Sequence, residues 1–307
     1  MPAPNADAFR DFLLKLQDSI CTKAESFEPE ARFECLRLDG ERMGFAQPRV
    51  LSGGRVFERA AVNFSSSAGS ELSPAATKRR PDLVGKSFQA VSLSMIFHPC
   101  NPHAPTAHMN LRLFVAGKGD STVWWFGGGF DLTPFYGYDQ DAIEWHQAAR
   151  AAVTPFGEPL FSEMKKACDD YFYLNHRKEP RGIGGVFFDD LREGGFARCE
   201  ALTRAVGEAF LSVYFPIVSR RKDTAFGAEE RRFQLERRGR YVEFNLLQDR
   251  GTLYGIQAGA RVESVLASMP PTVQWGYCRK EKPGSKEAEL YERYLVPRDW
   301  ADMSESA

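Results

Sequence analysis

Two neighbouring segments in the first half of the chain alternate between apolar positions and largely polar ones. In the run AHMNLRLFV, at 107–115, every second position carries a side chain suited to chemistry: His108, Asn110 and Arg112. Apolar residues fill the positions between them: Met109, Leu111, Leu113 and Val115. Successive side chains of a β-strand point to opposite faces. The pattern therefore predicts a strand with an apolar core face and a face that carries a proton carrier, an amide and a guanidinium.

The preceding run, QAVSLSMIFHP, repeats this arrangement. Val91, Leu93, Met95 and Phe97 alternate with Ser92, Ser94, Ile96 and His98, and the loop NPHAPTA joins the two runs. The spacing predicts an antiparallel pair whose polar faces point the same way. One interpretation is a binding site on that face. The other is a pair of half-solvated strands whose polar faces meet water.

The remaining pattern predicts a mixture of helices and strands. Phe9, Phe12, Leu13, Leu16 and Ile20 have the spacing of an amphipathic helix over 7–25. Further strands are predicted at 32–38, 55–64, 88–97, 121–126, 184–188, 240–247 and 252–257, and further helices at 139–153, 160–176, 197–215 and 262–268. The last helix ends before Pro270 and Pro271. The charged stretch 220–240 is interpreted as a solvated connection.

This order of elements favours an α+β fold with a large antiparallel sheet covered by helices on both faces. No Gly/Ser-rich or Pro-rich linker divides the chain, so residues 1–307 are expected to form one domain, with peripheral tails at about 1–6 and 301–307. With 43% hydrophobic and 13% aromatic residues, the chain can build a substantial core.

Composition narrows the possible partners. The formal net charge is −1, which gives no support to a general role on nucleic acid or a membrane surface. Arginine outnumbers lysine 28 to 12, which is compatible with an acidic substrate although GC-rich coding also favours arginine. The six cysteines include no C-x-x-C pair, and we find neither a signal peptide nor an apolar run of membrane-spanning length. We therefore expect a soluble cytoplasmic protein.

Histidines offer one candidate site. His98, His108, His146 and His176 could converge on a divalent metal through neutral imidazole nitrogens. However, His146 and His176 fall on the apolar stripes of predicted helices, where a hydrogen-bonded core histidine is the usual occupant. There is no compact ligand spacing such as H-E-x-x-H.

Two glycine-containing runs offer further candidates. WWFGGGFDLTP, at 124–134, combines flat apolar side chains with three glycines that allow a ligand close to the backbone, and Asp131 follows directly. It could wall a large planar ligand, or it could be a hairpin turn that Asp131 caps. In YGIQAGARVESVLASMPP, Gly259 and Arg261 stand at a predicted strand-to-helix junction, where they could hold a carboxylate.

Taken together, several runs resemble oxygen-dependent coproporphyrinogen III oxidases. They are Ser94, HPCNPHAPTAHMNLR, WWFGGGFDLTP, IEWHQ around His146, YFYLNHR around His176 and YGIQAGARVESVLASMPP. The resemblance covers essentially the whole chain beyond the first few residues. It implies oxidative decarboxylation of two propionates of coproporphyrinogen III, giving protoporphyrinogen IX, carbon dioxide and hydrogen peroxide from O2 in haem biosynthesis.

The resemblance also implies roles for individual residues. His108 matches the family's proton donor, and the substrate-binding positions match Ser94, Asn110, Leu111, Arg112, Gly259, Ala260 and Arg261. His98, His108, His146 and His176 match its metal ligands. A glycine pair of the family reads Gly259-Ala260 here. The resemblance further implies a homodimer paired through 241–276, where YVEFNLLQ offers an alternating strand whose edge needs covering.

Such a substrate fits the residues found independently of the resemblance. A flexible macrocycle with four carboxylates calls for guanidinium groups, apolar walls and close backbone approach. Its electron-rich rings can react with O2 directly, so we expect no organic cofactor and a metal that is dispensable for the chemistry. Asp131 is the candidate to hydrogen-bond the pyrrole N–H groups, while Arg112 and Arg261 would place propionates. A histidine-ligated metallohydrolase and a non-catalytic tetrapyrrole carrier are the alternatives.

Overall fold

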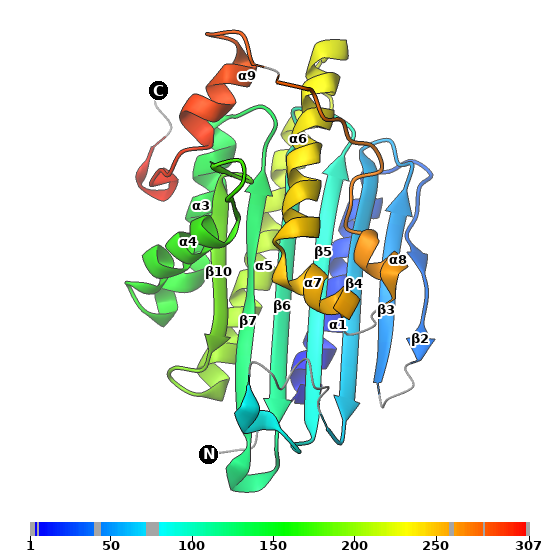
Figure 1. Cartoon of the computed structure of the whole chain (residues 1–307), viewed down its shortest axis with the longest axis vertical. Helices are drawn as coiled ribbons and strands as arrows, with labels where there is room; N and C mark the ends of the chain where they lie inside the picture. Colours follow the sequence, from blue (N-terminus) through cyan, green and yellow to red (C-terminus); the bar gives the residue numbers. More distant parts are fainter. Residues whose placement is uncertain are drawn as a thin grey trace.

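An antiparallel sheet of eight strands forms the centre of the molecule (Figure 1). The structure is a computed structural model that describes residues 4, 6–39, 44–71, 80–257, 261–278 and 280–304. The strand order is β1-β3-β4-β5-β6-β7-β10, and β2 also pairs with β3. The strands are β1 (Glu34–Cys35), β2 (Leu38–Asp39), β3 (Gly44–Ser52), β4 (Phe57–Gly69), β5 (Phe88–Pro99), β6 (Thr106–Ala116), β7 (Val123–Thr133) and β10 (Gly184–Leu191). A separate hairpin pairs β8 (Tyr173–Leu174) with β9 (Glu179–Pro180).

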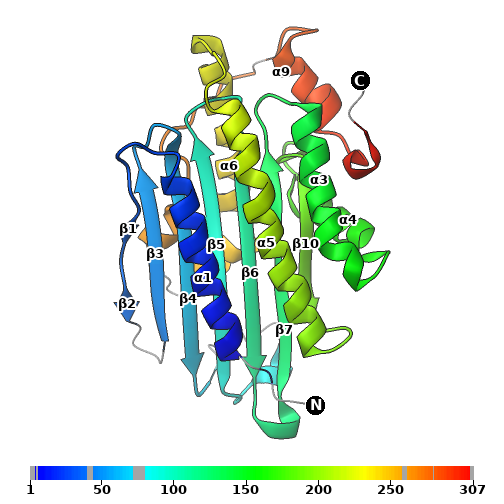
Figure 2. The ribbon, with the colours of Figure 1, turned by 180° about the vertical axis from the view of Figure 1, so that it is seen from behind.

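Helices cover both faces of the sheet. The helices are α1 (Ala6–Glu25), α3 (Asp139–Val153), α4 (Leu160–Tyr171), α5 (Phe196–Arg221), α6 (Ala228–Leu247), α7 (Arg250–Gln257), α8 (Val262–Leu266) and α9 (Lys286–Glu289). Figure 1 shows α6, α7 and α8 in front of the sheet, and Figure 2 shows α1, α3 and α5 against its other face. This arrangement confirms the predicted α+β class and the layers on both faces.

The alternation in β5 and β6 decides what each face of the sheet meets. On the face shown in Figure 2, Met109, Leu111 and Leu113 are buried together with the apolar stripe of α1 and with α5. The polar positions between them point to the face shown in Figure 1 and are half-buried. By length and composition alone, helix α5 could cross a membrane, but 56% of its most apolar 18-residue stretch is buried within the protein. Helix α5 is therefore interpreted as a core helix.

The segment 228–257 corrects three predictions. It forms α6 and α7, so neither the predicted strands at 240–247 and 252–257 nor the solvated connection at 220–240 exists. Phe233, Tyr241 and Phe244 have helical spacing and are buried. Between them, Arg237 and Arg238 are buried as well, because Glu179 and Glu58 pair with them. Because these two arginines lie on the buried side of α6, the sequence of α6 does not show the apolar stripe that identifies an amphipathic helix.

Other boundaries also differ from prediction. Helix α4 ends at Tyr171 rather than continuing to 176, because the chain turns into the β8–β9 hairpin. Helix α5 continues through Pro216 to Arg221, since Ile217 and Val218 are buried in the core. Strand β3 was not predicted. At the C-terminal end, Ala301 is buried in a short helical turn rather than in a peripheral tail.

Candidate functional site

The register sets the polar side chains of β5 and β6 beside one another, as the alternation predicted, on the face of the sheet that carries α8 (Figure 1), where Asn63 in the same row contacts Ser264. Ser94 is the register partner of Asn110, and Ser92 is the partner of Arg112. Across β6, Arg112 pairs with Gly127 of β7. Ser94, His108, Asn110 and Arg112 are all half-buried. We call the surface formed by Ser94, His108, Asn110, Arg112 and Gly127 the polar platform.

The triple glycine lies inside β7 and does not form the hairpin turn that was one of its two interpretations. A Cβ atom on Gly127 would lie 2.6 Å from Nε of Arg112. Gly129 has a φ of +142°, a conformation that favours glycine. The absence of a side chain at Gly127 therefore lets the Arg112 side chain lie across β7.

Aromatic side chains flank the polar platform. On the side of the β6–β7 hairpin, Phe114 stacks on Trp125 with ring centroids 4.4 Å apart. Towards α4, Phe187 stacks on Tyr171 at 4.4 Å. Trp124, by contrast, points to the other face of the sheet and packs on Phe196 of α5. The flat surface expected from the tryptophan pair thus comes from Trp125 alone.

His108 forms one end of a chain of charged groups. Its Nδ1 lies 2.9 Å from Oδ1 of Asp131, its register partner on β7. Asp131 is 1% exposed and accepts two further hydrogen bonds from Arg181, at 2.8 and 2.7 Å. Burial raises the pKa of Asp131, but the Arg181 and His108 side chains outweigh burial and hold this pKa below its ordinary value. The Asp131 carboxylate therefore orients the His108 ring through Nδ1.

Arg181 completes this chain from inside an aromatic enclosure. Its guanidinium carbon lies 4.1 Å from the ring centroid of Phe172 and 4.7 Å from those of Tyr241 and Phe244. Cation–π contacts and the Asp131 carboxylate together compensate the buried charge. Since Asp131 is 1% exposed, a direct contact with a pyrrole N–H would require the groups around it to move aside.

The four histidines that match metal ligands do not share a site. His98 contacts Thr106 and the carbonyl of Ser268, and His146 lies between the carbonyls of Ala142 and Ile183. Burial lowers the pKa of His98 and of His146 to about 3, so both are neutral. Among the described residues, no three His, Cys, Asp or Glu side chains are grouped to hold a metal ion. These residues do not fit a shared metal site.

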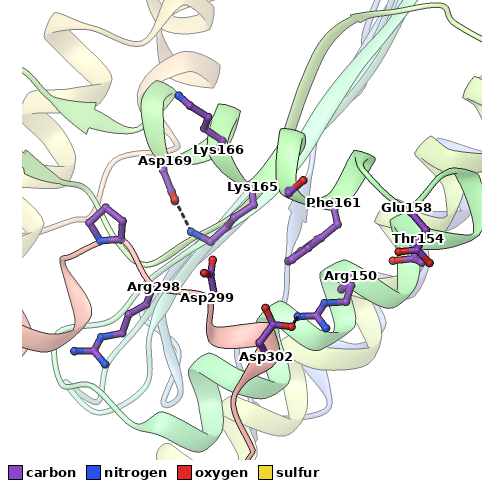
Figure 3. Close-up of a pocket in the computed structure, with 12 residues that line it drawn as sticks. Arg150, Thr154, Glu158, Phe161, Lys165, Lys166, Asp169, Arg298, Asp299 and Asp302 are labelled. Atoms are coloured by element: carbon purple, nitrogen blue, oxygen red, sulfur yellow. Dashed lines mark hydrogen bonds and ion pairs between the residues drawn. The ribbon is translucent and has the colours of Figure 1, made fainter.

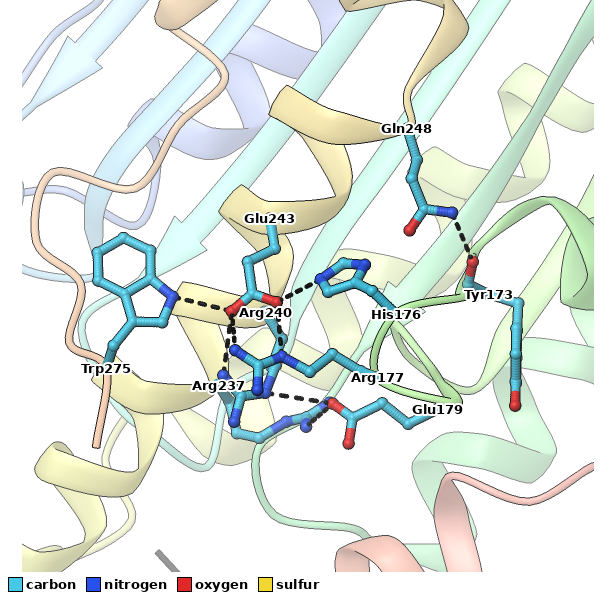
Figure 4. A network of polar contacts seen from close by, with 9 residues as sticks. All are labelled: Tyr173, His176, Arg177, Glu179, Arg237, Arg240, Glu243, Gln248 and Trp275. Atoms are coloured by element: carbon cyan, nitrogen blue, oxygen red, sulfur yellow. Dashed lines mark hydrogen bonds and ion pairs between the residues drawn. The ribbon is translucent and has the colours of Figure 1, made fainter. Parts of the chain in front are cut away.

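His176 belongs to a separate polar network centred on Glu243 of α6 (Figure 4). It lies in the β8–β9 turn, not on a helix, and its Nε2 contacts Glu243 at 2.7 Å. Arg177, Arg240 and Trp275 also donate to this carboxylate. Burial raises the pKa of Glu243, but donors led by Arg177 and His176 lower the pKa to about 2. The network fastens the hairpin and the segment around Trp275 to α6.

The second predicted carboxylate-binding segment is only partly described. Gly259 and Ala260 lie outside the described residues. Arg261 is exposed at the start of α8 and pairs with Glu263 at 3.1 Å. A helix precedes this segment, so α8 does not follow the strand that was predicted before it.

Leu111, another predicted substrate-binding residue, has its side chain buried on the opposite face of the sheet from the polar platform. Only its backbone could contact a ligand on the platform.

A pocket of about 470 Å³ lies elsewhere, between α3, α4 and the segment 297–302 (Figure 3). None of the platform residues lines it. Arg150 pairs with Asp302, and Lys165 pairs with Asp169. Its basic groups are thus matched by acidic ones, and the pocket offers little surplus positive charge for a polycarboxylate.

Comparison with known protein families shows the family of the chain. The family model described as Coproporphyrinogen III oxidase matches residues 8–300 of the 307. The chain belongs to the coproporphyrinogen III oxidase family. Its members act in porphyrin biosynthesis, and the family implies coproporphyrinogen III as the substrate. The match includes the polar platform, both aromatic groups and the Arg181–Asp131–His108 chain.

Three charged residues near the platform of this family member were missed by sequence reasoning. Arg181, Asp189 and Arg250 each fell in a short connection between two predicted elements, so no pattern singled them out. Arg112 donates to Asp189 at 2.8 Å, and Arg250 donates to the same carboxylate at 3.3 Å. The run FFDDL, with two acidic residues directly after a strand, was the available signal.

Proposed function

We propose that this protein catalyses the oxygen-dependent oxidative decarboxylation of two propionates of coproporphyrinogen III to vinyl groups. The observation that carries the proposal is the set of half-buried side chains of His108, Asn110 and Arg112 on one face of β6. These side chains lie between the Phe114–Trp125 and Tyr171–Phe187 ring pairs, and Gly127 leaves space beside Arg112. The row places a proton carrier and a carboxylate-binding group on one rigid strand. The aromatic groups offer apolar surface for the macrocycle.

The proposed chemistry divides between these residues. Each propionate loses CO2 and, from its ring-proximal carbon, one hydrogen, and the two electrons released reduce O2 to hydrogen peroxide. Arg112 would bind a propionate carboxylate through its guanidinium group. His108 Nε2 would exchange a proton with the substrate while Asp131 holds Nδ1. No step is assigned to a metal ion, since the histidines have protein partners of their own.

An oxygen-shift assay tests this function. Purified protein is mixed with coproporphyrinogen III without oxygen, and then air is admitted while protoporphyrinogen, CO2 and peroxide are measured. We expect no turnover before air, and after it two CO2 and two peroxide for each macrocycle, also in protein treated with a chelator. Binding without turnover would instead make the protein a tetrapyrrole carrier. Loss of turnover on chelation, restored by one stoichiometric metal ion, would favour a metal mechanism.

Substitution of Arg112 is expected to impair binding and turnover together. Arg112→Ala removes the donor that would anchor the propionate, and loss of one member of a charge-assisted pair costs about 2–5 kcal/mol. The half-exposed position places the effect at the lower end, roughly 30-fold in kcat/KM. Steady-state kinetics measure the change, with Arg192→Ala, a residue outside the platform, as the control. A kcat/KM within twofold of wild type would remove Arg112 from the site.

We also propose that the protein is cytoplasmic and forms a homodimer through the region 241–276. The strand expected there is absent, but the region carries apolar surface of another kind. Of twelve large hydrophobic residues that are exposed among the described residues, eight lie between positions 246 and 277: Leu246, Leu247, Leu253, Ile256, Val262, Leu266, Trp275 and Tyr277. Exposed apolar surface concentrated in this way is typical of an interface.

Dimerisation has a direct test. Sedimentation at micromolar concentration should show twice the 34.5 kDa mass of one chain. Leu253→Glu, which places a charge on the exposed apolar surface of α7, should shift the protein towards monomer. Val84→Glu, at an exposed apolar residue outside this region, is the control and should leave the dimer intact. A wild-type protein that sediments only as a single chain would refute this proposal.

A further inference from the structure

The carboxylate of Asp189 lies between two guanidinium groups that come from distant parts of the chain. Arg112 of β6 donates to its Oδ1 at 2.8 Å, and Arg250, the first residue of α7, donates to its Oδ2 at 3.3 Å. The side chains of Asp189 and Arg112 are 32% and 34% exposed, and that of Arg250 is 51% exposed. All three therefore remain within reach of a dissolved ligand.

A β-bulge brings Asp189 to this position. Strands β10 and β7 pair regularly as far as Phe188 and Gly128, and the pairing resumes at Leu191 and Phe126 with a shifted register. Two residues of β10 thus lie opposite Gly127 alone, and Asp190 takes a φ of +51°. Bulges of this kind redirect side chains and often lie beside active sites.

The neighbouring strand completes the arrangement. Because Gly127 has no side chain, the Arg112 guanidinium crosses β7 and reaches the carboxylate on β10. Asn110 accepts a second hydrogen bond from Arg112 at 2.9 Å, which fixes the plane of the guanidinium. Three adjacent strands thus contribute to the position of one side chain.

We propose that Asp189 is a positioning residue: it sets the orientation of the Arg112 guanidinium and the affinity of the site for a substrate carboxylate. Resting on the proposed function, the inference is that Asp189 occupies the donors of Arg112 and Arg250 while the site is empty, and that a substrate propionate competes for them. Arg112 then meets the substrate already extended across β7. The same competition weakens carboxylate binding, and Asp189 regains both donors when a propionate has lost CO2.

This role predicts opposite effects on affinity and turnover. Asp189→Asn keeps the size of the side chain and removes its charge, so both guanidinium groups become more available to a ligand. We expect coproporphyrin III, the stable oxidised form of the macrocycle, to bind about threefold to tenfold more tightly, as loss of a half-exposed competing charge permits. KM should fall in parallel, while kcat should fall roughly fivefold or more because Arg112 is no longer held in one orientation.

A neighbouring residue provides a matched control. Asp190→Asn makes the same charge change one residue away, at a carboxylate that is 71% exposed and lies 3.7 Å from Arg80. Affinity for coproporphyrin III is measured by fluorescence in each protein, together with affinity for its tetramethyl ester, which carries no carboxylate. Asp190→Asn should leave all values within twofold of wild type. The ester should bind wild type and Asp189→Asn equally.

Further outcomes separate the inference from the proposed function. Asp189→Glu retains the charge and should keep coproporphyrin affinity within twofold of wild type, and thermal unfolding shows whether each variant is folded. Three results would overturn the role of Asp189 without affecting the proposed function, provided that wild type turns over substrate. They are equal behaviour of Asp189→Asn and Asp190→Asn, weaker binding by Asp189→Asn, and tighter binding by Asp189→Glu. Should Asp189→Asn not fold, tight binding by a folded Asp189→Glu would still refute it. A wild-type protein that neither binds nor converts the tetrapyrrole would refute both the role of Asp189 and the proposed function.

Discussion

Asp131→Asn is expected to lower the free energy of unfolding by about 3–5 kcal/mol, because it leaves a buried guanidinium without its counter-charge. Arg181 is 2% exposed and cannot lose its proton, so it stays charged among Phe172, Tyr241 and Phe244. Equilibrium unfolding in urea measures the change. A loss below 1 kcal/mol would show that the aromatic rings alone compensate the charge.

A second substitution separates stability from catalysis. In Asp131→Asn combined with Arg181→Met, the buried charge is removed and an apolar side chain of similar length fills its place, so most of the lost stability should return. Turnover should not return, because His108 still lacks the carboxylate that orients it. We expect kcat to stay about 10²–10⁴-fold below wild type in both proteins. Recovery of activity with stability would mean that Asp131 serves the fold alone.

The stability difference between wild type and Asp131→Asn also depends on pH. The pKa of Asp131 is lowered in the folded protein from an ordinary value of 3.8. A carboxyl group with a lowered pKa stabilises the fold fully above its ordinary value and loses this contribution as the pH falls through the folded value. The difference should therefore be constant near neutral pH and shrink below about pH 4, which unfolding measurements from pH 7 to pH 3 can follow.

His108→Gln should abolish most of the turnover while substrate still binds. Glutamine can hydrogen-bond to Asp131 as the imidazole does, but it cannot carry a proton at neutral pH. We expect kcat to fall about 10²–10⁴-fold and the dissociation constant, measured without oxygen, to change by less than fivefold. Single-turnover rates after oxygen addition measure the chemical step directly.

The same kinetic measurements test the hypothesis that His108 and His176 are ligands of one metal ion. His176→Gln changes an exposed residue that contacts Glu243, and the structure assigns it no part in the proton transfer. Its kcat should remain within twofold of wild type. Equal losses in His176→Gln and His108→Gln would instead indicate that the two residues serve one metal site.

The parts of the site that lie on regular strands were predictable from the sequence. Alternation in the run with His108, Asn110 and Arg112 predicted both the strand and its polar face, since a period of two has one structural explanation there. Helix α6 was not predictable in the same way. Its inner side carries Arg237 and Arg238, and only their partners Glu179 and Glu58, far away in the sequence, make burial favourable.

Contacts across the sheet were equally hidden from the sequence. Asp131 was recognised as a candidate, but its pairing with Arg181 depends on the turn that ends α4 and on the hairpin that follows. The role of Gly127 depends on the register of β7 against β6, which no local pattern specifies. The same applies to the bulge that brings Asp189 towards Arg112.

The two-sided nature of β6 ties the evolution of the site to that of the core. Inserting or deleting one residue inside this strand would exchange its faces, so that the Arg112 guanidinium would enter the layer beneath α1 and α5 while Leu111 met water. Without a bulge such as the one in β10 to absorb the extra residue, such a length change would disturb the core and the site together. By contrast, the turn at 117–122 after the strand, where residues 118–121 are exposed, could change length without altering which residues of β6 face which way. Length variation in related chains should accordingly fall in this exposed turn, and not in the strand or in the buried turn before it, where Asn101, His103 and Ala104 are packed.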